Sequence, residues 1–214
     1  MKRLILPMLF GLLAAGASYA DQIFYDTTTG SQFNCTATGS LTGCGTDTVT
    51  IGGVVQLTYQ PGTSGAPGIG LLPPAQSNAN FGSLVFSCVT NTSCGPVDVP
   101  TGLTLTININ QTGPDVVSGA IPVGTIEGST ISGTSSGAYI VWTNTSVTLQ
   151  GTTLTDTYAI QQTLLGLYAP NTGGGLTTIQ GEIIAANAPE PAISLLCASG
   201  LVLFGTIRFR RKKA

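Results

Sequence analysis

A stretch of eight residues near the middle of the chain alternates between apolar and polar side chains without a break. Leu103, Leu105, Ile107 and Ile109 are apolar, and the residues between them are Thr or Asn. A period of two places the two sets of side chains on opposite faces of a β-strand. Similar runs recur at residues 48–51, 54–59, 81–89, 125–131, 138–142, 146–149, 157–168 and 176–184. The pattern predicts an all-β fold, an antiparallel β-sandwich, with a barrel as the second choice.

Glycine and proline separate these runs and predict the connections. Gly52-Gly53 is a two-residue signal of a β-hairpin turn. Residues 133–137 and 171–175 are rich in Gly with Ser or Asn and predict two longer hairpin loops. Residues 61–74 predict one long surface loop, because their prolines exclude both a helix and a central strand.

The amino-terminal residues have the pattern of a secretory signal peptide. Lys2-Arg3 precedes an apolar run at residues 4–16, and the small residues Ser18 and Ala20 precede Asp21. This pattern predicts export, with cleavage between Ala20 and Asp21 by signal peptidase. The alternative is a signal anchor that is retained.

Three segments are therefore expected. Residues 1–20 form the signal peptide, residues 21–187 form the ectodomain, and residues 188–214 form a separate tail. The ectodomain has the length of one ordinary domain and can bury a hydrophobic core.

Basic residues are confined to the two ends of the chain. The sequence has 7 Lys and Arg and no His, and none of them lies between Leu4 and Ile207. Eight of the 9 acidic residues lie in the ectodomain: Asp21, Asp26, Asp47, Asp98, Asp115, Glu127, Asp156 and Glu182. Nucleic acid is excluded as a partner, and anionic membrane surfaces are disfavoured, because both need cationic side chains. Ser–His, Cys–His and phosphoryl-transfer chemistry lack their base or cation, so no catalytic residue is assigned.

Carboxylates alone leave two chemistries to weigh. A glycosidase needs only a pair of carboxyl groups, and Glu127 and Glu182 are the two glutamates of the ectodomain. The simpler interpretation is that each is an outward-facing polar residue of its strand. Calcium could be bound by carboxylates from distant loops, but the Asp residues stand alone in sequence, so no metal or other cofactor is expected.

Four cysteines lie in the ectodomain and a fifth, Cys197, lies in the tail. Export predicts an oxidising compartment, and four cysteines allow three disulfide connectivities. We prefer Cys35–Cys44 with Cys88–Cys94, since each pair closes a short, turn-rich loop. Zinc is the weaker alternative, because the spacings lack C-x-x-C pairs and no His is present.

Carbohydrate binding would use exposed aromatic side chains as stacking platforms. Trp142 lies in a strongly apolar run and is expected in the core. Tyr59 and Tyr168, at the ends of their runs, are weak candidates for such a platform.

The tail combines an apolar run with a basic end. Residues 192–207 are apolar and would form a helix of about 24 Å, short of the ~30 Å hydrocarbon core. Basic residues behind a hydrophobic segment place the carboxyl terminus in the cytoplasm and the ectodomain outside. These topology residues are Arg208, Arg210, Arg211, Lys212 and Lys213. The expected element is one short transmembrane helix.

Pro189-Glu190-Pro191 directly precedes this apolar run. The motif, the short helix and the terminal basic cluster together resemble the PEP-CTERM sorting signal of exosortase-processed bacterial proteins. The resemblance covers only the tail and says nothing of what the ectodomain binds. It implies a Gram-negative host, often one that makes extracellular polysaccharide, and cleavage near Pro189-Glu190-Pro191 by an exosortase. The alternative for the tail is a permanent single-span anchor.

The expected function is that of a non-enzymatic cell-surface or biofilm-matrix protein. As a precursor it would sit in the inner membrane, and after tail removal at the cell surface or in the extracellular matrix. Its expected partners are signal peptidase and an exosortase-type protease or transpeptidase. The alternatives are a carbohydrate-binding module for extracellular polysaccharide and, more remotely, a carboxylate-pair glycosidase.

Overall fold

The computed structural model describes residues 21–36, 40–64, 69–71, 75–90, 93–152 and 155–187. Within these ranges the chain forms strands β1 to β15 and one 3-10 turn, η1 (Gly173–Gly175). The predicted signal peptide at 1–20 and the tail at 188–214, including the sorting motif and the basic cluster, lie outside the described residues. No helix of the described part is long and apolar enough to span a bilayer.

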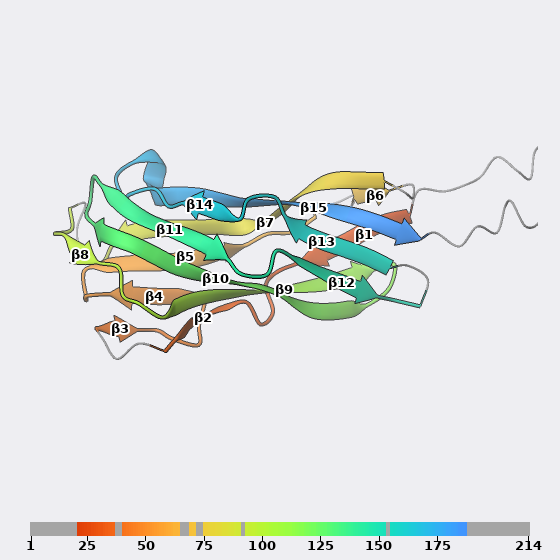
Figure 1. Ribbon diagram of the computed structural model, residues 1–214, viewed down its shortest axis with the longest axis horizontal. Coiled ribbons are helices and arrows are strands. Elements are labelled where there is room, and N and C mark those ends of the chain that lie inside the picture. The colour runs from red at the N-terminus through yellow and green to blue at the C-terminus, as the bar shows by residue number, and fades with distance from the viewer. Residues whose placement is uncertain are drawn as a thin grey trace, which may run out of the picture. The chain divides into compact units, whose positions relative to one another are not determined.

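The strands form two antiparallel sheets, and Figure 1 labels most of these strands. The first sheet has the order β14 (Leu164–Gly166), β11 (Ser136–Trp142), β10 (Val117–Ile131), β9 (Leu103–Gly113), β1 (Asp21–Asp26) and β6 (Ile69–Leu71). In addition, β2 (Gln32–Cys35) pairs with β9, and β8 (Val97–Asp98) pairs with β10. The second sheet has the order β12 (Ser146–Gln150), β13 (Thr155–Ile160), β15 (Leu176–Asn187), β7 (Ala75–Cys88), β5 (Val55–Pro61), β4 (Thr48–Ile51) and β3 (Leu41–Thr42).

The alternation in the sequence sets the direction of the side chains, as predicted. Along β9, Leu103, Leu105, Ile107 and Ile109 are fully buried, while the Thr and Asn residues between them are partly exposed. Inward side chains of both sheets belong to one continuous hydrophobic cluster. The all-β prediction is confirmed, and two antiparallel sheets around one core fit a β-sandwich.

Some of the predicted connections are confirmed and others are wrong. Gly52 and Gly53 both have positive φ and form the turn between β4 and β5, where Val54 N–H donates to the Ile51 carbonyl (3.2 Å). Residues 133–137 lie in the β10–β11 hairpin, as expected.

Residues 171–175 do not form a hairpin loop. They lead from β14 in the first sheet to β15 in the second, so the expected pairing of the flanking strands does not occur. Residues 61–74 are not a single loop either, because Ile69–Leu71 adds β6 to the edge of the first sheet beside β1. The run at 157–168 divides into β13 and β14, which belong to different sheets.

Tyr25 joins the first sheet to the backbone of the second. Its hydroxyl donates to the Asn80 carbonyl and accepts from the Asn80 N–H, both at 3.0 Å. Asn80 lies on β7 beside a register shift in the β7–β15 ladder, so regular pairing is interrupted there. The tyrosine hydroxyl therefore satisfies two backbone groups at an irregular point of the ladder.

Tyr59 makes a second polar contact one residue further along β7. Its hydroxyl donates to the Phe81 carbonyl (2.5 Å) and lies 2.6 Å from Thr27 Oγ1. Thr27 follows β1 directly, is fully buried, and accepts a hydrogen bond from Gly62 N–H (2.8 Å). Tyr59 is only 1% exposed, so this network lies inside the core and ties the two sheets together.

A third tyrosine bridges the sheets from the opposite direction. Tyr158 of β13 donates its hydroxyl to Gln111 Oε1 of β9 (2.8 Å), and both side chains are buried. The ring centroid of Tyr25 lies 5.9 Å from that of Phe81 and 5.9 Å from that of Tyr158, and both pairs have edge-on geometry. Together these side chains form an aromatic cluster with satisfied hydroxyl groups between the sheets.

Burial governs the ionisation of these phenols. Desolvation raises the pKa of Tyr25 and of Tyr59 to about 12. Desolvation also raises the pKa of Tyr158, and the nearby carboxylate of Asp156 raises it further. All three phenols stay protonated far into the alkaline range.

Both preferred cysteine pairs lie at disulfide distance. The Cα atoms of Cys35 and Cys44 are 5.7 Å apart, and those of Cys88 and Cys94 are 5.3 Å apart. These separations lie within the range of disulfides and fit the sequential connectivity. One pair ties the end of β2 to the turn between β3 and β4, and the other ties the end of β7 to the segment that leads to β8.

The chain enters and leaves this β unit at the same end. Figure 1 shows the start of β1 and the end of β15 together at that end, while β8 and η1 lie at the other. The loops of β8, of residues 132–135 and of η1 are joined by hydrogen bonds from Gly133 N–H to the Cys94 carbonyl (3.1 Å) and from Asn171 N–H to the Gly133 carbonyl (2.8 Å).

Replacing Tyr59 by Phe tests the polar connection between the sheets. The variant keeps the ring but leaves the buried Thr27 hydroxyl and Phe81 carbonyl with one partner fewer. We expect a loss of about 1–3 kcal/mol in the free energy of unfolding, measured by denaturant titration. The matched control is Tyr168→Phe, at an exposed tyrosine, which should leave the midpoint unchanged. Equal midpoints for the two variants would contradict the assigned role.

High pH should destabilise the fold through the same tyrosines. An unfolded tyrosine ionises near pH 10, whereas Tyr25 and Tyr59 keep their protons to about pH 12 in the fold. The folded state therefore holds more protons between these values, and the free energy of unfolding falls as the pH rises from about 10 towards 12. Denaturant midpoints across this range should decline, with a shallower slope in Tyr59→Phe. A midpoint constant up to pH 12 would refute the expectation.

Candidate functional site

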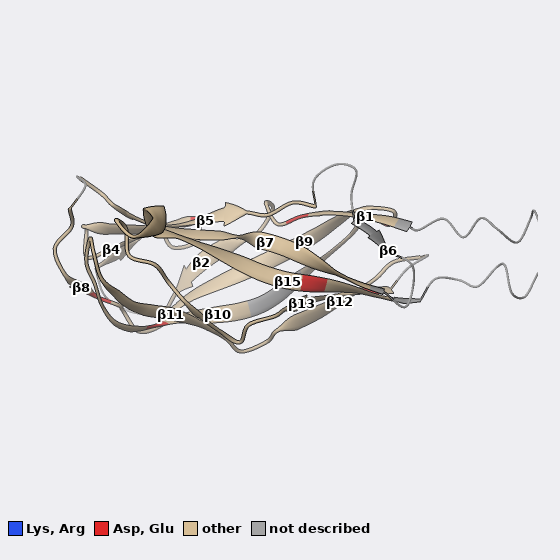
Figure 2. Cartoon of the chain, turned by 90° about the horizontal axis from the view of Figure 1, so that it is seen from above, with Lys and Arg blue, Asp and Glu red and all other residues tan. Residues whose placement is uncertain are grey.

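The surface of the β unit carries charges of one sign. Figure 2 shows acidic residues scattered over the strands and no basic residue in the described part of the chain. The described residues also contain no group of three or more His, Cys, Asp or Glu side chains that could hold a metal ion. Chemistry at this surface therefore depends on isolated carboxylates, hydroxyls, amides and aromatic rings.

The two ectodomain glutamates are not brought together. Glu127 is exposed on the outer face of β10 in the first sheet, between the buried Ile126 and the positive-φ Gly128. Glu182 lies on β15 of the second sheet between the buried residues Gly181 and Ile183, so it points outward on the opposite side. Stacked sheets lie about 10 Å apart, and these two side chains point away from each other. The separation of their carboxyl groups is therefore larger than the roughly 5–9.5 Å that a glycosidase pair needs. Glu127 and Glu182 therefore do not form the carboxylate pair on which the glycosidase hypothesis depends.

The aromatic candidates have different fates. Trp142 is 4% exposed and belongs to the core, as expected. Tyr59 was expected at the surface as a weak binding candidate, and this is wrong, because it lies inside the polar network between the sheets. Tyr168 is 56% exposed and remains available to a ligand.

A groove opens where the ladder along β10 is interrupted. Residues up to Ile126 of β10 pair with β9, and Thr130 and Ile131 pair with β8. Residues 99–102 connect β8 to β9 and do not pair regularly with β10. This segment is held by a hydrogen bond from Val99 N–H to the Ser129 carbonyl (3.0 Å). The 99–102 segment leaves space beside Glu127.

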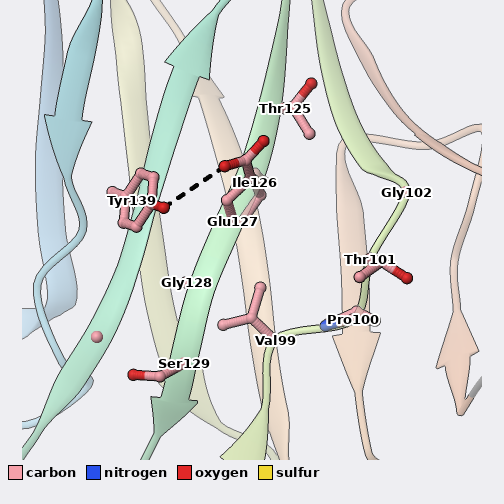
Figure 3. Close-up of a pocket in the computed structure, with 11 residues that line it drawn as sticks. Val99, Pro100, Thr101, Gly102, Thr125, Ile126, Glu127, Gly128, Ser129 and Tyr139 are labelled. Atoms are coloured by element: carbon pink, nitrogen blue, oxygen red, sulfur yellow. Dashed lines mark hydrogen bonds between the residues drawn. The ribbon is translucent and has the colours of Figure 1, made fainter.

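Figure 3 shows the side chains around this space. Glu127 stands between Tyr139 of β11 and the 99–102 segment, and the Tyr139 hydroxyl donates to Glu127 Oε2 at 3.5 Å. The cavity is open and measures about 580 Å³. Its polar lining residues are Thr101, Thr125, Glu127, Ser129 and Tyr139. We call it the Glu127 groove.

Gly128 lines the Glu127 groove and lies tightly against β11. Gly128 has φ +130°, and an added Cβ would lie 2.9 Å from Ala138 Cα and overlap the Gly137 carbonyl oxygen. A larger residue would need both a strained backbone and a displaced β11 strand. Gly128 therefore allows β10 and β11 to lie close together directly before the register shift between Gly128 and Ile131.

A second groove surrounds Tyr168. It lies between β14 of the first sheet and the start of β15 in the second, and measures about 690 Å³. Tyr168 is held by its N–H, which donates to Thr177 Oγ1 (3.1 Å). Gln162, Thr178 and Gln180 supply further polar groups, and Leu176 supplies exposed apolar surface. We call it the Tyr168 groove.

The sequence held a signal for Tyr139 that we did not use. Tyr139 stands between Ala138 and Ile140, which are both buried, so strict alternation places its ring outward. Its pairing with Glu127 depends on the β10–β11 register, which sets these two residues directly opposite each other. The register across the four-residue loop between β10 and β11 was not evident from composition or spacing.

The described residues thus define an all-β unit with antiparallel sheets and two open polar grooves. No protein-family model matches this chain, and no curated protein and no solved structure matches it significantly. The resemblance of residues 188–214 to a PEP-CTERM signal stays a prediction that rests on the sequence of that tail.

Proposed function

We propose that this chain is an exported β-sandwich protein without enzymatic activity, sorted by an exosortase to the cell surface or extracellular matrix. The distribution of its bases carries the proposal. All seven lie before Leu4 or after Ile207, beside the two segments whose patterns predict a signal peptide and a sorting tail. Bases in these places serve membrane topology.

Several features of the β unit support this proposal. Its cysteine pairs lie at disulfide distance, which suits a compartment outside the cytoplasm. Its two ends lie together, away from the loops of β8 and η1. The short apolar segment of the tail would insert in the inner membrane, where Pro189-Glu190-Pro191 would be recognised by the exosortase.

Intact-mass analysis of the protein from its native host tests export and sorting together. The mature species should begin at Asp21 and end near Pro189, and it should gain about 4 Da on reduction as four thiol hydrogens are added. Trypsin, which cleaves after Lys and Arg, should leave the denatured, reduced mature species uncut, because no base lies between Asp21 and Pro189.

The control is Glu190→Ala, which should accumulate precursor that trypsin shortens after Arg208. A mature pool that retains its full carboxyl terminus, with no change in Glu190→Ala, would refute sorting and favour the permanent anchor.

Carbohydrate binding is the second candidate, and the exposed Tyr168 in its groove favours it. An aromatic face beside carboxamide and hydroxyl groups suits the apolar face and hydroxyls of a sugar. If the candidate is right, the full chain will retain neutral oligosaccharides on a glycan array and Tyr168→Ala will abolish the retention. Tyr139→Ala is the matched control in the other groove and should retain binding. Retention equal in Tyr168→Ala would remove the Tyr168 groove from consideration.

A further inference from the structure

Glu127 is an exposed carboxylate with no basic side chain to balance it. The sequence contains no Lys, Arg or His between Leu4 and Ile207, so no cation of the β unit can pair with it. Its hydrogen bond from the Tyr139 hydroxyl is long, at 3.5 Å, and comes from an uncharged donor. The carboxylate can therefore accept a charged donor from outside the chain.

Tyr139 lies directly opposite Glu127 in the β10–β11 register and shares the groove with it. An aromatic ring attracts a cation that lies near its face. A ring and a carboxylate on one wall both favour a positively charged group, and neither favours an anion. The groove therefore favours ligands that carry a positive charge.

The rest of the Glu127 groove suits a hydroxyl-rich ligand. Thr101, Thr125 and Ser129 contribute hydroxyl groups that can both donate and accept hydrogen bonds. The groove is open, so a long polymer can lie across it. Its volume of about 580 Å³ falls in the range of small-molecule sites. The large exposed hydrophobic side chains of the β unit, including Val116, Leu164 and Leu176, lie elsewhere, so the groove lacks the apolar anchors of a protein interface.

We propose that the Glu127 groove binds an amino sugar unit of a polysaccharide, with the protonated amino group at Glu127 and against the Tyr139 ring. The hydroxyl groups of the sugar contact Thr101, Thr125 and Ser129. Anionic polysaccharides are excluded, because the β unit has eight acids and no base to receive them. The site is separate from the Tyr168 groove and does not depend on sorting.

Titration of the full chain in mild detergent with a glucosamine oligomer tests the site. The matched ligand is the N-acetylated oligomer of equal length, which has the same ring and no positive charge. We expect binding of the glucosamine oligomer, weaker at high salt, and at least tenfold weaker binding of the N-acetylated oligomer.

Two glutamate variants locate the interaction. Glu127→Gln should weaken binding of the glucosamine oligomer by about tenfold, the usual scale for a charge-assisted hydrogen bond. Glu182→Gln removes the same charge from the outer face of the other sheet and should leave affinity unchanged. Tyr139→Phe keeps the ring, so it should retain most of the affinity, whereas Tyr139→Leu should lose it. Equal denaturant midpoints for the variants exclude unfolding as the cause.

Each contrary result overturns the proposal. Equal weakening by Glu127→Gln and Glu182→Gln would mean attraction to the overall negative charge. Equal binding of both oligomers, unaffected by Glu127→Gln, would mean neutral carbohydrate binding and would leave the second candidate function standing. No binding of either oligomer at millimolar concentration would refute a sugar site in this groove.

Discussion

The two sheets are held in place by tyrosine hydroxyls that contact the backbone of β7. Around Asn80 and Phe81 the β7 ladder is irregular, and its backbone groups would be costly to bury without partners. Tyr25 from the first sheet and Tyr59 from the second supply those partners. The contacts of Tyr25 with Asn80 and of Tyr59 with Thr27 cross between the sheets and are directional, so they fix one relative position of the two sheets, which apolar packing alone specifies less sharply. The inward-facing side chains of the remaining strands can pack against each other only when the two sheets hold that position.

The chain achieves this stability without ion pairs inside the β unit, since it has no base there. Uncharged pairs occupy the outer faces instead. Asn34 Nδ2 donates to Thr106 Oγ1 (3.0 Å) across β2 and β9, and the hydroxyls of Thr148 and Thr157 lie 3.0 Å apart across β12 and β13. Cross-strand pairs of this kind each contribute a few tenths of a kcal/mol up to about 1 kcal/mol. Exposed ion pairs contribute about as little, so their absence costs the fold little.

Alternation predicted the strands wherever one face is buried and the other is wet. It located β4 and β9 closely. It also indicates that Tyr59 is buried, because Tyr59 lies on the same face of β5 as Val55 and Leu57. We placed Tyr59 at the surface because it ends its apolar run. The sequence could not reveal that residues 171–175 cross between sheets, since a Gly-rich turn looks the same in either role. The Glu127 groove was hidden for a similar reason: it exists because β8 and β9 pair with different parts of β10, a long-range register that local pattern does not encode.

The one-signed surface also governs how many copies of the β unit behave together. At neutral pH the exposed acids of each copy keep neighbouring molecules apart. Acid protonates these carboxylates, yet between residues 21 and 187 no basic side chain exists to give the unit a positive charge in return. Most proteins regain mutual repulsion below their isoelectric point, whereas this unit, apart from an α-amino group, only approaches neutrality. A dense layer of such molecules would swell in neutral water, contract as its surroundings turn acid, and stay contracted until the acid is removed.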